Sequence, residues 1–406
     1  MPTVFVPKET RSGETRVAAI PATVKRMVKE GLSVTLEAGA GLTAHFADQE
    51  FTDAGATIAT DRAQGWGTAD VVLHINIPRA EEISLMKEGS SIITFLWAYE
   101  NLELVKILQE RKISCFSMDA LPRITRAQKD DALSSQANLA GYKAAVLAAY
   151  HLGKIMPMMM TPSGTIRPSR VVVVGAGVAG LQAIATAKRL GANVEVSDVR
   201  PEVKEQAESL GATYIEVEGA EGYSSDSGYA REQTEDDKRR QQETLHKHVA
   251  AADAIITTAL IPYRPAPKII TEAMLKDMRP GSVIIDLAAE RGGNCAYTEA
   301  GQTVVKEGVT IVGCVKLEDS VPVNASAMYG MNMFNILKDY LKEGQLVWNF
   351  EDEIVDGAMI THGGEVHHPK VREALGLPPK EPPPEEKKEE PPDQEKSEGE
   401  KKEATS

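Results

Sequence analysis

Short runs of β-branched and aliphatic residues alternate with helical patterns along the first 120 residues of the chain. The runs that predict buried strands are 4–7, 33–38, 56–60, 70–77, 91–97 and 113–118. Residues 22–31 and 101–111 instead carry apolar side chains at the three- and four-residue spacing of an amphipathic helix. Alternation of this kind predicts a parallel, doubly wound sheet.

A second series of the same kind begins at Arg170. Its expected strands are 170–176, 193–198, 212–217, 253–260, 282–288 and 309–315. Long helical patterns at 132–152 and 323–342 flank this series, whereas the prolines and Gly164 within 156–170 predict a loop or crossover. We therefore expect an α/β protein with two doubly wound parallel-sheet domains linked by long helices.

Domain boundaries follow from the order of these series. One domain is expected to be discontinuous, formed by residues 1–131 plus 320–376, with 132–319 forming the other. An excursion at about 220–240 is rich in Gly, Ser and Asp before it becomes helical, which predicts a mobile lid, with an ordinary surface loop as the alternative. The Pro/Glu/Lys-rich end, 377–406, has almost nothing to bury and is expected to be disordered.

Composition narrows the possible functions. The formal charge of −14 argues against a general nucleic-acid binder. Cys115, Cys295 and Cys314 are far apart and show no CxxC spacing, which predicts buried thiols in a reducing cytoplasm. No secretory pattern opens the chain and no apolar run reaches 18 residues, so we expect a soluble protein that could still dock on a membrane protein.

The strongest chemical signal is RVVVVGAGVAGLQAIATAKRLGANVEVSDVR. A buried strand leads into Gly175, Gly177 and Gly180, spaced GxGxxG at a helix start. The first glycine permits a tight turn, the second lets a pyrophosphate approach the backbone, and the third lets the helix pack against the strand. The phosphates would then bind the N–H groups at the helix N-terminus. Asp198, 21 residues after Gly177, ends the next strand, where an acid binds the adenosine ribose 2′-hydroxyl.

This combination predicts a Rossmann-like NAD(H) site. The carboxylate of Asp198 favours NAD over NADP because it would repel a 2′-phosphate, although Arg200 could soften that preference. The residues expected at this part of the cofactor are Gly175, Gly177, Val178, Ala179, Gly180, Asp198, Val199 and Arg200.

Motifs for other chemistries are missing. The sequence has no GxxxxGK[ST] phosphate loop, no GxSxG elbow and no HExxH. His246 and His248, and the group His362, His367 and His368, have spacings that could suit a metal. Because no cysteines accompany them, we interpret them as surface histidines and expect no metal site.

The stretch LPRITRAQKDDALSS, residues 121–135, is dense in polar groups. It contains Arg123, Arg126, Gln128, Lys129, Asp130 and Asp131. Local pattern favours a charged helix start, but a phosphate-binding patch or the polar part of an active site stays open.

Several of these motifs resemble one known family. PKETRSGETRVAAIPATV, PRITRAQ…ALSSQANLAGY, GAGVAGLQAIATAKRLGA, TTALIP and GGNC are similar to motifs of alanine dehydrogenase and of its relative, the NAD(H)-binding component of proton-translocating nicotinamide nucleotide transhydrogenase. The resemblance covers roughly residues 1–370. Within the pair, RITRAQ…LSSQ and the GYARE segment are specific to the transhydrogenase.

Two positions separate the relatives chemically. The resemblance implies that alanine dehydrogenases hold pyruvate with a lysine and move a proton with a histidine; the matching positions here are Asn76 and Trp97. Asn76 cannot supply a cation and Trp97 cannot shuttle a proton, so we expect no alanine dehydrogenase activity. Direct hydride transfer between two nicotinamides needs orientation and the exclusion of water, with no substrate proton to move.

The resemblance also implies site residues. The nicotinamide clamp, as we call it, would consist of Arg123, Gln128, Asp131, Ser134 and Tyr142. Further expected contacts to the cofactor are Arg126, the mobile-loop residues Gly228 and Tyr229, Gln241, Thr258, Ala259 and Leu260. Relatives commonly have an uncharged pair where this chain has Lys129-Asp130, so either aspartate could be the functional one; Asp131 is favoured because it keeps the spacing to Ser134.

The family works as three components, which implies partners for this chain. We expect NAD(H) to bind here, NADP(H) to bind a partner component, and a membrane component to move protons. A homodimer, peripheral on the cytoplasmic face of the membrane, is also expected from the resemblance. The alternatives are an alanine-dehydrogenase-like oxidoreductase and a non-catalytic NAD(H) sensor.

Overall fold

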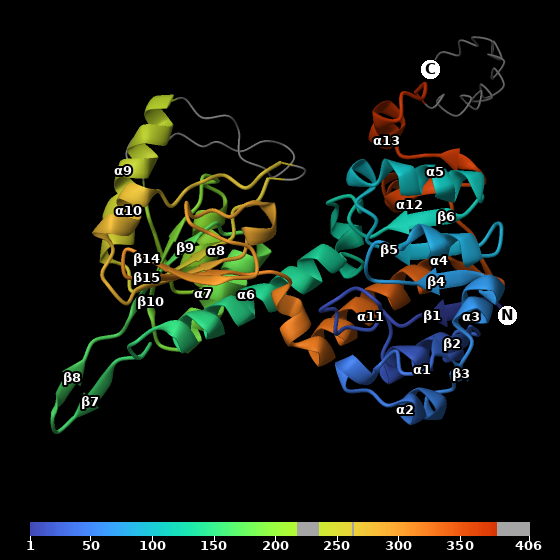
Figure 1. Ribbon diagram of the computed structural model, residues 1–406, viewed down its shortest axis with the longest axis horizontal. Coiled ribbons are helices and arrows are strands. Elements are labelled where there is room, and N and C mark those ends of the chain that lie inside the picture. The colour runs from blue at the N-terminus through green and yellow to red at the C-terminus, as the bar shows by residue number, and fades with distance from the viewer. Residues whose placement is uncertain (217–234, 262–263, 380–406) are drawn as a thin grey trace, which may run out of the picture.

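The computed structural model describes residues 1–216, 235–261 and 264–379, which form two α/β halves joined by long helices (Figure 1). We call the half around the first sheet the N-terminal domain and the half around the second sheet the nucleotide domain. The predicted fold class is confirmed: each half is a sheet of mainly parallel strands with helices packed on it.

The sheet of the N-terminal domain has the strand order β19-β18-β6-β5-β4-β1-β2-β3. These strands are β1 (Thr3–Val6), β2 (Ser33–Glu37), β3 (Thr57–Ala59), β4 (Val71–Leu73), β5 (Ser91–Thr94), β6 (Ser114–Ser117), β18 (Met359–His362) and β19 (Glu365–Val366). Strands β1 to β6 pair in parallel, whereas β18 and β19 form an antiparallel edge. The helices around this sheet are α1 (Pro21–Lys29), α2 (Asp48–Asp53), α3 (Arg62–Thr68), α4 (Ala80–Leu85), α5 (Leu102–Glu110), α12 (Glu353–Ala358) and α13 (Pro369–Ala374).

The sheet of the nucleotide domain has the order β11-β10-β9-β12-β13-β15-β14. These strands are β9 (Arg170–Val174), β10 (Asn193–Ser197), β11 (Thr213–Tyr214), β12 (Ala254–Thr257), β13 (Val283–Asp286), β14 (Thr303–Lys306) and β15 (Val309–Gly313). All pair in parallel except the edge strand β14, which was not predicted from the sequence. The helices here are α7 (Val178–Arg189), α8 (Val203–Ser209), α9 (Glu235–Ala251) and α10 (Glu272–Asp277).

Two long helices, α6 (Ala132–His151) and α11 (Pro322–Tyr340), connect the domains (Figure 1). Ala132, in the first turn of α6, is buried in the core of the N-terminal domain, whereas Ala144, Ala145 and Ala148 are buried in the core of the nucleotide domain. Because these side chains are small, α6 can lie close to neighbouring backbone at both ends. The helix is therefore a single rigid link between two cores.

The loop expected at 156–170 is instead partly a β-hairpin, which corrects that prediction. Strands β7 (Met159–Thr161) and β8 (Gly164–Ile166) pair antiparallel, and every residue of both is exposed. The hairpin projects from the nucleotide domain away from the N-terminal domain (Figure 1). A second short hairpin, β16 (Leu341–Lys342) with β17 (Gln345–Leu346), follows α11. Within the described ranges, no helix has the length and apolar character to cross a membrane.

Candidate functional site: a dinucleotide turn joined to a polar helix start

The three glycines of the fingerprint lie between β9 and α7 and match the physical roles predicted for them. Gly175 has a φ of +96°, which suits glycine. A Cβ on Gly180 would lie 1.9 Å from the carbonyl oxygen of Gly175, so only glycine permits this close packing. A Cβ on Gly177 would meet nothing within 4 Å, so the backbone there is open. Val178, with 39 % of its surface exposed, begins α7, where free N–H groups could bind a pyrophosphate.

Asp198, just after β10, has its carboxylate held in place by the chain itself. Its Oδ2 accepts a hydrogen bond of 2.7 Å from the N–H of Ala176, inside the glycine turn. Arg200 donates to both oxygens, with Nε at 3.0 Å from Oδ1 and a terminal nitrogen at 2.9 Å from Oδ2. The Tyr214 hydroxyl donates to the carbonyl of Asp198, and burial raises the pKa of Tyr214 to about 12. The acid predicted to bind the ribose is thus also a brace of the turn, and it is neutralised by Arg200 instead of leaving that arginine solvated.

Thr258, Ala259 and Leu260 follow β12, at the carboxyl edge of the sheet beside the glycine turn. The Thr258 hydroxyl donates to the carbonyl of Gly175 at 3.0 Å. Asn294 accepts from the N–H of Ala259 at 3.0 Å and donates to its carbonyl at 2.8 Å. Leu260 is half exposed. This edge is where α/β sheets of this type bind ligands.

Asp286 and Asn294 support this edge and were not singled out from the sequence. Asp286 is fully buried, and its Oδ2 accepts from the backbone N–H of Asn294 at 2.7 Å and from the Thr298 hydroxyl at 2.6 Å. The motif GGNC was noticed only as part of a resemblance. The signal that could have identified Asp286 is an acid ending the apolar strand SVIID, just as Asp198 ends NVEVSD.

The clamp residues Asp131 and Ser134 lie together at the start of α6. The Asp131 carboxylate accepts from the backbone N–H of Ser134 at 2.9 Å and from its hydroxyl at 2.5 Å, so Asp131 is the N-cap of the helix. Arg123 and Gln128 precede it on the exposed surface, Gln128 within the 3-10 helix η3 (Thr125–Lys129). The charged helix start that local pattern favoured is therefore present, and the same residues form the proposed clamp.

The other polar residues of this stretch face the N-terminal domain. Arg126 binds Asp352, the N-cap of α12, through two hydrogen bonds. Lys129 lies 2.6 Å from Asp339 of α11. Asp130 is buried, and its Oδ1 has no hydrogen-bond partner among the described residues. The structure thus gives Arg126 a protein partner, and its role as a cofactor contact stays a prediction.

Tyr142 lies two turns after Ser134 on α6 and is 44 % exposed. Its neighbour Gly141 is the point where α6 meets α7, since a Cβ there would lie 2.1 Å from the carbonyl oxygen of Ala179. Ala179 belongs to the glycine fingerprint. The helix that begins at the clamp therefore touches the dinucleotide turn, and Gly141 is a site residue that was missed from the sequence.

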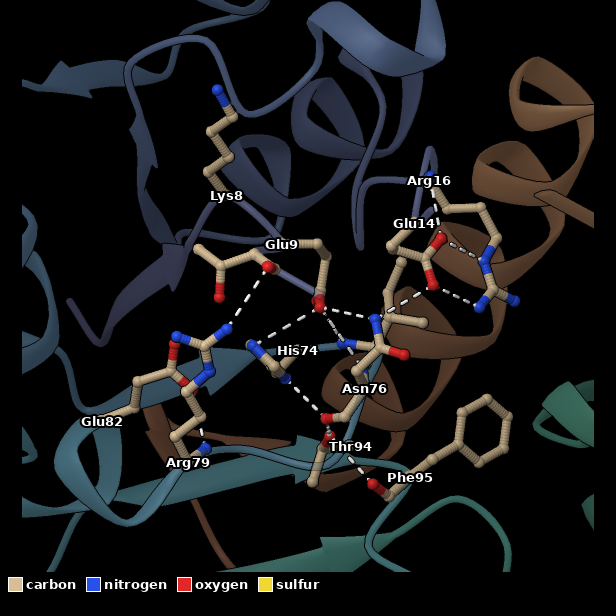
Figure 2. Close-up of polar contacts among 12 residues, drawn as sticks. Lys8, Glu9, Glu14, Arg16, His74, Asn76, Arg79, Glu82, Thr94 and Phe95 are labelled. Carbon is tan, nitrogen blue, oxygen red and sulfur yellow. Dashed lines mark hydrogen bonds and ion pairs between the residues drawn. The ribbon is translucent and has the colours of Figure 1, made fainter. Parts of the chain in front are cut away.

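Asn76 occupies the position where the resemblance implies a lysine in alanine dehydrogenases. Figure 2 shows its amide between two carboxylates, donating 2.8 Å to Glu9 and 3.0 Å to Glu14. Its Oδ1 accepts from Lys316 of the nucleotide domain at 2.9 Å. Trp97, at the histidine position, has a φ of +50°. The two carboxylates beside Asn76 make this region unfavourable for a carboxylate substrate.

Buried charges surround Asn76. Arg16, 4 % exposed, donates to both oxygens of Glu14 at 2.7 Å, and although burial opposes it, this pairing lowers the pKa of Glu14 to about 2. Burial raises the pKa of Asp319 to about 7, against the attraction of Arg16. The Nε2 of His74 has no hydrogen-bond partner within the described chain, but it lies 3.6 Å from Glu9.

The remaining predicted residues are placed as follows. Gly228 and Tyr229 lie outside the described residues. Gln241 lies on α9, half-buried, and its contact with a cofactor stays a prediction. His246 pairs with Asp277 and His248 with Glu195, each at 2.8 Å.

The fold and the glycine turn define a two-domain dinucleotide-binding α/β protein. The profile of the alanine dehydrogenase/PNT N-terminal domain matches residues 5–140, and that of the C-terminal domain matches 144–369. The chain belongs to this family.

Relatives on the transhydrogenase side are the more similar ones. The chain is 47 % identical to the first of the separately encoded pieces of NAD(P) transhydrogenase subunit alpha in Rhodospirillum rubrum, over 90 % of this chain and 98 % of that protein. It is 44 % identical to NAD(P) transhydrogenase subunit alpha of Haemophilus influenzae, over 93 % of this chain and 74 % of that protein. The crystal structure of transhydrogenase from Sinorhizobium meliloti matches with a TM-score of 0.82 and 44 % identity, over 90 % and 99 % of the two chains. An L-alanine dehydrogenase structure, 23 % identical with a TM-score of 0.76, shares the fold.

These findings support a component of a nicotinamide nucleotide transhydrogenase and the binding of a nicotinamide nucleotide. An alanine dehydrogenase of Staphylococcus saprophyticus is 29 % identical, well below the transhydrogenase relatives. The order of similarity therefore agrees with the substitutions at Asn76 and Trp97.

Proposed function

We propose that this chain is the NAD(H)-binding component of a proton-translocating transhydrogenase, and that a hydride passes directly between NADH bound here and NADP⁺ on a partner component. The observation that carries the proposal is the course of α6. Gln128, Asp131 and Ser134 lie at its N-terminal end, and Gly141 lies against the dinucleotide turn. One helix thus places polar, orienting groups at a fixed distance from the place where the pyrophosphate would bind.

Bound NADH supplies the hydride chemistry, and the chain supplies binding and orientation. The glycine turn and the start of α7 would hold the pyrophosphate, and Asp198 the adenosine ribose. Asp131 keeps Ser134 in one orientation through its two hydrogen bonds, so the helix start is a preorganised set of donors and acceptors. Holding a reactant in a near-attack geometry can account for a large part of a rate enhancement without any acid or base.

An alanine-dehydrogenase-like reaction is disfavoured by the surroundings of Asn76. A keto acid would need a cation there, yet the amide of Asn76 is bonded to Glu9 and Glu14, and Lys316 is bonded to Asn76. Turnover of pyruvate, ammonia and NADH by the pure protein would revive this alternative. A non-catalytic NAD(H) sensor would share the glycine turn but would not need the clamp.

The proposal includes the partners that the resemblance implies. They are an NADP(H)-binding component and a membrane component that moves protons, with this chain attached peripherally on the cytoplasmic face. The names of the relatives support the arrangement, because each is designated as subunit alpha or as a piece of it.

A homodimer is part of the same proposal, and the hairpin β7–β8 supports it. Met158, Met159, Met160 and Ile166 are all exposed by 44 % or more. A two-stranded hairpin alone in water is marginally stable, so covering by a second copy would stabilise it. Sedimentation analysis of the pure protein tests this, with a monomer at micromolar concentration as the contradicting result.

The decisive experiment mixes the pure protein with an NADP(H)-binding transhydrogenase component. We expect NADH-dependent reduction of NADP⁺ in which the deuterium of [4-²H]NADH appears in NADPH and not in water. If NADH binds but no label is transferred, the proposal fails and the sensor is favoured.

A further inference from the structure

Lys316 lies where the chain leaves the nucleotide domain for the N-terminal domain. It follows the end of β15 and directly precedes the 3-10 helix η5 (Leu317–Ser320), which leads into α11. Its φ is +47°, in the left-handed region. A long side chain is strained there, and such residues persist where their surroundings hold them. The groups that hold the side chain of Lys316 belong to the other domain.

The ammonium of Lys316 is bound by a preoriented amide. Its Nζ donates to Oδ1 of Asn76 at 2.9 Å and lies 3.8 Å from Oε2 of Glu14. The nitrogen of the same amide donates to Glu9 and to Glu14, as Figure 2 shows. With both donors used, the amide cannot rotate without losing two hydrogen bonds, so its oxygen stays directed at Lys316. Asn76 follows β4 in the N-terminal domain, so this bond crosses the domain junction.

Arg16 makes a second, buried connection at the same junction. Beside its pairing with Glu14, it lies 3.0 Å from Asp319 and 3.5 Å from Glu318, both in η5. It also donates to Gln136 at 3.0 Å, on the first turns of α6. Arg16 therefore ties the clamp helix and the segment after Lys316 to one buried point of the N-terminal domain.

Lys316 is poorly suited to bind an external anion. Acids lie on its side of the junction in excess, since Glu9, Glu14, Glu318 and Asp319 face two cations, Lys316 and Arg16. A carboxylate entering here would compete with these groups for the same cations. The partner of the Lys316 ammonium is therefore the protein.

We propose that Lys316 is a positioning residue for hydride transfer, whose bond to Asn76 fixes the nucleotide domain in the setting that orients the clamp toward bound NAD(H). Lys316 touches neither the glycine turn nor the clamp residues in any contact described above, so it acts through the domain setting. The kinetic part of this inference rests on the proposed function. The domain setting itself does not, and it can be measured without any partner.

The kinetic test compares Lys316→Met, Lys316→Arg and the control Lys87→Met. Lys87 pairs with Asp70 at 2.8 Å within the N-terminal domain and crosses no junction. With the NADP(H)-binding component, we expect Lys316→Met to lower the single-turnover rate at least 10-fold and to change the NADH dissociation constant less than 3-fold. Lys316→Arg should restore most of the rate, and Lys87→Met should match the wild type.

Other outcomes would overturn the inference. A wild-type rate in Lys316→Met would show that the bond is dispensable, and an equal loss of rate and affinity would show a direct binding role. A lowered melting temperature with an unchanged rate would show a merely structural role.

The domain setting is tested on the full chain without a partner. Spin labels are attached to Lys25→Cys on α1 and Thr303→Cys on β14, both exposed, while the three native cysteines are buried. With NADH present, we expect a broader interdomain distance distribution in Lys316→Met than in the wild type and Lys316→Arg. An unchanged distribution overturns the positioning role, whereas a failure of the proposed function would show as absent hydride transfer in the wild type.

Discussion

The backbone of Gly141 on α6 lies directly against the backbone of Ala179 on α7. A Cβ on Gly141 would come within 2.1 Å of the Ala179 carbonyl oxygen, a distance that real Cβ atoms do not reach. This contact joins the helix that begins at Asp131 to the helix that begins at Gly177. The spacing between the proposed clamp and the dinucleotide turn therefore depends on the absence of one methyl group.

Gly141→Ala should push α6 and α7 apart. Because the obstacle is backbone and not a flexible side chain, we expect a loss of about 1–3 kcal/mol in the free energy of unfolding, as in other overpacked sites. NADH affinity should fall as well, because the turn is displaced. Thermal unfolding and NADH fluorescence titration measure the two effects.

Gly153→Ala is the matched control, since a Cβ there meets nothing within 4 Å and Gly153 lies just beyond the same helix. Its stability and NADH affinity should equal those of the wild type. If Gly141→Ala behaves like this control, the close contact does not set the helix spacing.

The clamp predicts a separation of rate from affinity. Gln128→Ala removes an exposed side chain and should slow hydride transfer far more than it weakens NADH binding, because orientation is lost. Asp131→Ala should do the same and also lose about 1 kcal/mol of stability, because Asp131 caps α6. Asp131→Asn keeps a good cap, so its melting temperature should stay near the wild-type value while its rate reports the carboxylate. Equal losses of rate and affinity in Gln128→Ala would contradict the clamp.

Asp198 and Arg200 predict how the cofactor is selected. Asp198→Ala should weaken NADH binding by about 1–3 kcal/mol, the order expected when a buried hydrogen-bonded group is removed. Arg200→Ala exposes a carboxylate that Arg200 now neutralises, so it should increase the preference for NADH over NADPH. Fluorescence titrations with both nucleotides measure this ratio. An unchanged ratio would mean that Arg200 does not influence the 2′-position.

The nucleotide turn was readable from the sequence because its determinants are local. Gly175, Gly177 and Gly180 must stand at fixed spacing between a strand and a helix, and Asp198 must end the next strand. The strands β9, β10, β12, β13 and β15 were predictable for a similar reason, as buried apolar runs.

What could not be predicted depends on tertiary contacts. Gly141 looks like any glycine within a helical pattern, and its need for close approach arises only once α7 is in place. The junction of Lys316 with Asn76 joins residues 240 positions apart in the sequence. The strands of the hairpin β7–β8 are only three residues long and lie among prolines, so the pattern indicated a loop.

Asp130 provides an explanation for the unusual Lys129-Asp130 pair. Its side chain is enclosed by charged and titratable groups from three elements: Arg126 and Lys129 of its own segment, Asp339 and Tyr340 of α11, and Asp352 at the start of α12. Burial raises the pKa of Asp130 to about 7, Lys129 opposes this, and Asp339 reinforces it. Asp130 is therefore expected to bind a proton near neutral pH, one position before the cap of α6.

Asp130 should make the stability of the protein depend on pH. Its pKa is higher in the folded chain than in the unfolded chain, so folding favours the protonated form. The stabilisation is complete below about pH 4 and is lost as the pH rises through about 7. Asp130→Asn does not titrate, so its advantage over the wild type should grow between pH 4 and pH 7 by up to about 4 kcal/mol and then level off. Urea unfolding of both proteins from pH 4.5 to pH 8.5 measures this difference.

The control for this experiment is Asp53→Asn, which removes the same charge from the exposed end of α2. Groups such as Asp319, whose pKa is also raised to about 7, titrate in every variant and cancel in the comparison. A difference between Asp130→Asn and the wild type that is constant with pH, or equal to that of Asp53→Asn, would show that Asp130 stays ionised in the fold. If the difference does grow with pH, the rate of hydride transfer should be compared over the same range, because the ionisation would then act on the segment between Gln128 and Asp131.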